Sequence, residues 1–261
     1  MQFQIHRQLA PTDAAALDSL NSKVAIEPAN LTAGDTMGAS PPPWVGFPDA
    51  ATKATYDAQM QAATDAAQHY ASAAAAANDG YVLSSYFISE FGVHWVKWSL
   101  VTKPFDPAHP AMLLYDGDGT DAHLVGLSYY TFSAGTAPAG FAGSNDVWHR
   151  HFGDCYAGGF VIGEDITDAD TCTKIGEARD AGFVHQPVGT PAEAGDIQRY
   201  LSSHPGPPEA APSFDSVLVD GNNEWMLHAW TVPGHPNRLG MFATANPDVQ
   251  HCVGACRSAT T

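Results

Sequence analysis

The spacing of apolar positions changes near residue 80, where a helical segment is followed by strand-like segments. Between residues 49 and 78 alanine predominates, and the larger apolar side chains, including Tyr56, Met60 and Tyr70, recur at helical intervals. Alanine is the best helix former, and this spacing places apolar side chains on one face of a helix. The sequence therefore predicts one long helix over residues 49–78, ended by Gly80, since glycine readily adopts the left-handed conformation beyond a helix.

From residue 81 the apolar positions approach a period of two, which is typical of strands. Strand-like segments occupy residues 93–95, 113–115, 124–132, 214–218 and 224–232. A turn sequence, Asp116-Gly117-Asp118-Gly119, separates two of them in the manner of a hairpin. These elements predict an α+β fold, in which the long helix packs on a mainly antiparallel, curved or barrel-like sheet. A cupin-type barrel is the specific hypothesis.

The chain shows no internal repeat and no linker between two independent cores. Residues 1–48 are mixed and rich in proline towards their end, which predicts an extended N-terminal arm. Residues 49–261 are expected to form a single domain with an insertion over residues 156–215, where turn residues and acidic residues concentrate. Within this insertion, residues 191–202 are a candidate for a short helix.

Four histidines in strand-like segments predict a shared metal site. His149 and His151 are two residues apart, so on a strand they project from the same face. His94 and His228 alternate with apolar neighbours in two other segments. A single strand histidine is usually a hydrogen-bonded core residue, but neutral imidazole is also the commonest metal ligand, and four such residues favour ligation. The expected cofactor is one transition-metal ion, and imidazole does not choose among copper, iron and zinc.

Acidic and phenolic side chains near these histidines are candidates for catalysis. Glu90 precedes His94 by four residues and is a candidate ligand, general base or partner of an imidazole, with a solvated surface carboxylate as the alternative. Tyr129 and Tyr130 are candidate proton donors in a pocket. These residues predict a mononuclear metal-dependent enzyme, with an oxidoreductase acting on a small organic substrate preferred. A non-catalytic metal-binding protein for sequestration or sensing and a zinc-dependent hydrolase are the alternatives.

Several short motifs occur in an order that carries a family resemblance: Gly92-Val93-His94-Trp95, Leu124-Val125-Gly126-Leu127 and Leu227-His228-Ala229-Trp230. The chain resembles a largely uncharacterised family of exported bacterial proteins, and the His-x-His pair is more weakly similar to cupins. The family resemblance implies a site shared by His94 and His228. The glutamate of the family falls at Ser128, so this chain departs from the pattern there, and His149 and His151 are expected to complete the site.

The charge of the chain bears on its partners. Lysine and arginine number 11 against 28 aspartates and glutamates, so the formal net charge is −17. Nucleic acids and anionic membrane surfaces attract basic proteins, and no apolar run approaches the roughly 20 residues that span a bilayer. We therefore expect a small-molecule substrate and cations as partners, and neither nucleic acid nor membrane. The sequence leaves the oligomeric state open.

Four cysteines bear on the compartment. Cys155 and Cys172 lie 17 residues apart, and Cys252 and Cys256 lie close together near the C-terminus. Two local disulfides would indicate an oxidising compartment, so the protein is expected to be secreted or periplasmic, with its leader removed. Free thiols and a cytoplasmic location are the alternative, because the first six residues lack the apolar core of a signal peptide.

Overall fold

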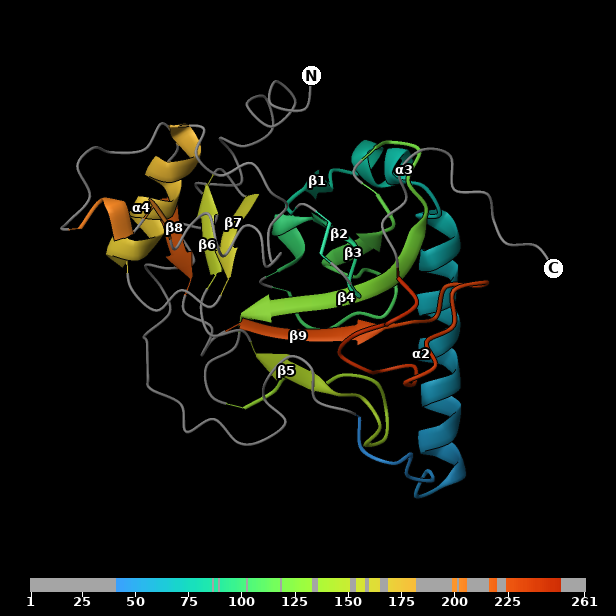
Figure 1. The fold of residues 1–261 in the computed structure, drawn as a ribbon. Coiled ribbons are helices and arrows are strands. Elements are labelled where there is room, and N and C mark those ends of the chain that lie inside the picture. Colours follow the sequence, from blue (N-terminus) through green and yellow to red (C-terminus); the bar gives the residue numbers. More distant parts are fainter. Residues whose placement is uncertain are drawn as a thin grey trace.

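A computed structural model describes residues 41–132 except 86, 89, 102 and 118, and also residues 136–150, 154–157, 160–164, 169–181, 199–200, 202–205, 216–219 and 224–249. Within these ranges the fold is mixed α+β, in agreement with the prediction (Figure 1). None of the helices in the described ranges has the length and apolar character required to span a membrane. The predicted arm over residues 1–48 lies outside the described residues up to residue 40.

The helix predicted over residues 49–78 is wrong in one respect, because the chain forms two helices there. They are α2 (Ala50–His69) and α3 (Ala73–Asn78). Between them Ser72 forms a β-bridge with His123, and the two N–H groups that follow donate to carbonyls in the turn before β4. Pairing with a distant segment thus replaces the helical hydrogen bonds that the alanine-rich sequence favours.

The main sheet has six strands, which are all antiparallel to their neighbours and follow the order β1-β2-β3-β4-β9-β5. In that order they are Val82–Leu83, Val93–Val96, Met112–Tyr115, Leu124–Phe132, Glu224–Ala229 and Trp148–Arg150. A short 3-10 helix, Trp98–Leu100, follows β2. The strand order is linear, so the sheet is open within the described residues, and the predicted barrel-like closure is not found there.

One face of this sheet packs on α2 (Figure 1). The helix contributes Ala63 and Ala67, which are almost fully buried and share a core with Val93, Leu113 and Leu227 of the sheet. Small alanine side chains allow close approach of the helix to the strands. The amphipathic pattern that predicted a buried helix face is thus explained by this layer.

The opposite face, which we call the histidine face, carries His94, Ser128, His149, Met226 and His228. Ser128 pairs across the strands with His228, and His149 pairs with Met226. Cross-strand partners lie on the same face of a sheet, as do residues two apart on one strand. All five side chains are buried. The four residues of β4, β5 and β9 therefore lie close together in a largely apolar layer.

A second, smaller sheet lies only partly in the insertion predicted over residues 156–215, because β6 begins before it and β8 follows it. Its strands follow the order β7-β6-β8 and span Phe160–Glu164, Asp154–Ala157 and Ser216–Val219. Helix α4 (Ala169–Asp180) packs on it and contains Cys172, which is buried and disulfide-bonded. The other three cysteine side chains lie outside the described part, so two local disulfides stay a prediction. The helix candidate over residues 191–202 also lies largely outside it.

A charged hydrogen-bond network joins the break between the helices to the sheet. The hydroxyl of Tyr70 donates to the carboxylate of Asp79 at 2.5 Å, and the ammonium of Lys97 donates to the same oxygen at 2.9 Å. The hydrogen bond from Tyr70 and then that from Lys97 lower the pKa of Asp79. This network fixes the end of α3 beside the end of β2.

Gly92, which precedes β2, should not tolerate a side chain. Its φ is +90°, and a Cβ atom would lie 2.4 Å from the carbonyl oxygen of Tyr115. Gly92→Ala should therefore lower the free energy of unfolding by about 3 kcal/mol, through backbone strain and overpacking. Urea unfolding followed by tryptophan fluorescence measures the loss. Gly46→Ala is the control, since no atom lies within 4 Å of its added Cβ. Equal midpoints for the two variants would contradict this packing.

The Tyr70–Asp79 hydrogen bond should make part of the stability depend on pH. The pKa of Asp79 is lowered in the folded protein, so its contribution is present above the unfolded pKa of about 3.9 and is lost as pH falls through the folded value. Tyr70→Phe should therefore destabilise the protein more at pH 7 than at pH 3 when urea midpoints are compared. Tyr115→Phe is the control, because its hydroxyl donates to backbone carbonyls, those of Tyr70 and Ser72, which do not titrate. A loss for Tyr70→Phe that is the same at both pH values would rule out the carboxylate as its partner.

Candidate metal-binding site

Two of the four predicted histidines lie side by side on the histidine face. The ring centroids of His149 and His228 are 5.0 Å apart, and the two rings meet edge to face at 74°. Their side chains are 0% and 1% exposed, respectively. Adjacent strands β5 and β9 bring them together although 79 positions separate them in the sequence. The geometry thus provides two imidazoles in one buried location.

The ring of His228 is held in a defined orientation. Its Nδ1 lies 2.5 Å from the carbonyl oxygen of Thr244, and its Nε2 lies 3.1 Å from the sulfur of Met226. A carbonyl only accepts hydrogen bonds, so Nδ1 carries the proton and Nε2 of the neutral ring carries the lone pair. The rings of Phe91 and Trp230 contact the imidazole edge to face, with centroids 5.7 and 5.6 Å away. The lone pair of Nε2 therefore faces Met226 inside an aromatic enclosure.

Met226 is a residue of this site that was not predicted from the sequence. It precedes His228 by two residues and pairs with His149 across the strands, so it lies on the face shared by both histidines. The signal was the Met-x-His spacing in a segment that alternates as a strand. Methionine in an apolar strand is also an ordinary core residue, and this second meaning concealed it.

His94 belongs to the same face but not to this pair. Two strands, β3 and β4, lie between β2 and β9. At the usual strand spacing of about 4.8 Å, β2 and β9 are therefore roughly 14 Å apart. The Nδ1 atom of His94 lies 2.9 Å from the hydroxyl oxygen of Ser85, and its backbone N–H donates to that same oxygen at 2.9 Å. Among the described residues, no three histidine, cysteine, aspartate or glutamate side chains are grouped so as to hold a metal ion. His151 lies outside the described residues.

Ser128 is buried beside His228. It is the cross-strand partner of His228, its side chain is 0% exposed, and its Oγ has no hydrogen-bond partner within the described part of the chain. A buried hydroxyl in this state carries a free-energy cost of desolvation. A polar atom thus adjoins the histidine pair in an otherwise apolar layer.

Glu90 lies in a turn rather than on a strand, so its spacing of four residues does not place its side chain beside that of His94. It occupies a turn with a φ of +72°, where its backbone carbonyl accepts from the N–H of Asn246 at 2.8 Å. Its side chain is exposed, whereas the ring of His94 is buried. The turn that ends at Gly92, with its bridge between Ile88 and Gly92, interrupts the alternation that the prediction assumed.

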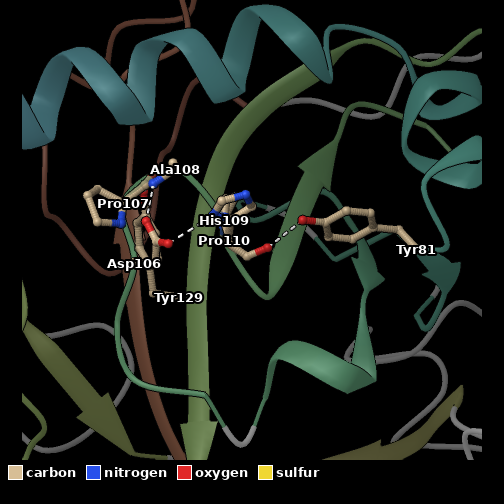
Figure 2. Close-up of polar contacts among 7 residues, drawn as sticks. All are labelled: Tyr81, Asp106, Pro107, Ala108, His109, Pro110 and Tyr129. Atoms are coloured by element: carbon tan, nitrogen blue, oxygen red, sulfur yellow. Dashed lines mark hydrogen bonds and ion pairs between the residues drawn. The ribbon is translucent and has the colours of Figure 1, made fainter.

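Tyr129 and Tyr130 line an open pocket of about 250 Å³, solvent at its mouth included. The hydroxyl of Tyr129 donates to the carbonyl of Pro107 at 2.9 Å, and that of Tyr81 donates to the carbonyl of Pro110 at 2.6 Å (Figure 2). The two hydroxyls hold the loop over residues 106–110 at both ends. Burial raises the pKa of Tyr129 well above the usual range. Through its hydrogen bond to Pro107, Tyr129 positions the loop over residues 106–110.

The same pocket is lined by a paired histidine and aspartate that are not among the predicted site residues. Nδ1 of His109 lies 2.8 Å from Asp106, whose other carboxylate oxygen accepts from the backbone N–H of Ala108 (Figure 2). Burial raises the pKa of Asp106, but these two hydrogen bonds lower it, and the net shift is downward. Both side chains are half exposed or more. This arrangement shapes the turn and leaves the pair in contact with solvent.

Two buried serines, Ser128 beside His228 and Ser85 beside His94, should respond oppositely to substitution. Ser128→Ala should raise the stability of the metal-free protein by about 1 kcal/mol, because it removes a buried hydroxyl without a described partner. Ser85→Ala should lower it by about 1 to 2 kcal/mol, because it removes both hydrogen bonds to His94. Urea unfolding in the presence of a chelator measures both. If Ser128→Ala were as destabilising as Ser85→Ala, the environment of Ser128 would be polar.

Comparison of the chain with protein-family models, with curated proteins and with solved structures finds no match. The resemblance to exported bacterial proteins and to cupins therefore stays a prediction.

Proposed function

We propose that this protein binds a transition-metal ion and that His149 and His228 provide two of its ligands. The contact between the two rings, at 5.0 Å and with both side chains almost fully buried, carries the proposal. Ligating histidines usually donate their second N–H to a carbonyl or carboxylate, which fixes the ring. The contact of His228 Nδ1 with Thr244 is of this kind. The net charge of −17 favours the approach of cations.

The burial of His149 and His228 favours a protein that holds a metal ion over one that uses the ion in catalysis. A catalytic metal keeps a ligand position open for water or substrate, and aromatic rings contact His228 on two sides. The geometry therefore best supports a non-catalytic metal-binding protein, for sequestration or sensing. The open sheet is sufficient to form this site, so the site does not depend on a cupin-type barrel. The barrel stays a prediction. The secreted or periplasmic location also stays a prediction.

A metal-dependent oxidoreductase remains the second candidate function, and the pocket favours it. Tyr130 lines the pocket and is the cross-strand partner of Met226, which is itself paired with His149. A small organic substrate bound in this pocket would thus be separated from Met226 and the proposed metal site by one residue, Tyr130. The zinc hydrolase has less support, because the candidate carboxylate Glu90 is exposed on a turn.

Metal titration of the purified full-length chain, after treatment with a chelator, tests the proposal. We expect one ion per chain, and we expect His149→Ala and His228→Ala each to weaken binding by about tenfold or more. His109→Ala, on the surface, is the control and should bind as the wild type does, since its side chain is 61% exposed. His94→Ala should also retain binding, because β2 is distant from β9. Isothermal titration calorimetry and elemental analysis give affinity and stoichiometry. Unchanged binding in both variants of the pair would overturn the proposal.

A further inference from the structure

We infer that Met226 is a third ligand and that the site selects copper(I) over zinc(II). This inference rests on the proposed function, because it names the metal of the same site. Its basis is the arrangement of three side chains: Met226 pairs with His149 across the strands, and its sulfur lies 3.1 Å from Nε2 of His228. Two nitrogen donors and one thioether sulfur are thus gathered on the histidine face.

The nitrogen and the sulfur are close enough to approach one ion. At a tetrahedral angle of about 109°, metal bonds of about 2.0 Å to nitrogen and about 2.3 Å to sulfur place the two donor atoms about 3.5 Å apart. The distance between Nε2 of His228 and the sulfur of Met226 is 3.1 Å, so the two side chains would move slightly apart to admit the ion.

The orientation of the His228 ring leaves one nitrogen able to bind a metal. Nδ1 of His228 donates to Thr244, so Nε2 of the neutral ring carries a lone pair on the side of the Met226 sulfur. A soft cation bound there would be ligated by this nitrogen and by the thioether sulfur.

The ligand types select the metal. Thioether sulfur is a soft, neutral ligand that suits copper(I), whereas zinc(II), a borderline ion, is usually bound by thiolate, imidazole and carboxylate. His149, Met226 and His228 are all neutral donors, so a monovalent ion leaves one buried charge where a divalent ion would leave two. The three side chains are 0%, 3% and 1% exposed, and burial strengthens this preference. The chemistry of the site is therefore that of a copper(I) carrier or store.

Competition with a chromophoric copper(I) chelator under anaerobic conditions, beside zinc(II) titration, tests the inference on the full-length chain. Met226→Leu keeps the volume of the side chain and removes the sulfur. It should weaken copper(I) binding by about tenfold or more and leave zinc(II) binding within about twofold of the wild type. Met60→Leu is the control, because Met60 packs against the core beneath α2, on the other face of the sheet. X-ray absorption at the copper edge should show a sulfur neighbour in the wild type and in Met60→Leu but not in Met226→Leu.

The possible results distinguish the role of Met226 from the proposed metal binding by His149 and His228. If Met226→Leu binds copper(I) as tightly as the wild type while His149→Ala and His228→Ala do not, the histidine pair holds the metal and Met226 is not a ligand. If the wild type binds zinc(II) more tightly than copper(I), the selectivity is wrong. If the wild type binds neither ion, both the proposed function and this inference fail. Circular dichroism of each variant establishes that it is folded before binding is compared.

Discussion

The pairing of β4 with β9 is the constraint on which the rest of the structure depends. Six consecutive residue pairs join the two strands, and their register places Leu227 in the core beneath α2 while Met226 and His228 face the other way. A shift of one residue would exchange the two faces of β9. It would bury His228 against α2 and move Leu227 to the histidine face. The apolar core and the candidate metal site are therefore fixed by the same set of hydrogen bonds.

Much of the fold could be predicted because its causes are local. Alanine content and the spacing of Tyr56, Met60 and Tyr70 predicted α2, and alternation predicted β4 and β9. The break before α3 could not be predicted, since it depends on a bridge between Ser72 and His123, which are 51 positions apart. Strand order was equally inaccessible. The position of β9 between β4 and β5 follows from contacts between distant segments, which a local pattern does not encode.

The candidate site was predicted in part for the same reason. His149 and His228 each stood out as histidines in apolar, alternating segments, and the sheet brings them together. His94 has the same local pattern, but only the strand order reveals that two strands separate it from β9. Glu90 was placed by assuming a regular strand, and the positive φ of its turn invalidates that assumption. Met226 was missed because its sulfur gains meaning only from its neighbours in space.

The position of β9 between β4 and β5 also determines when the site can form. Among the described strands, β9 is the only one that pairs with β5, and it follows β5 by more than 70 residues in the chain. During synthesis on the ribosome, β2, β3 and β4 can pair as they emerge, whereas β5 must wait for residues 224–229. Contacts between such distant segments form slowly because a long loop must first close. A nascent chain that ends before β9 therefore has a partial sheet but no pair of histidines with which to hold an ion.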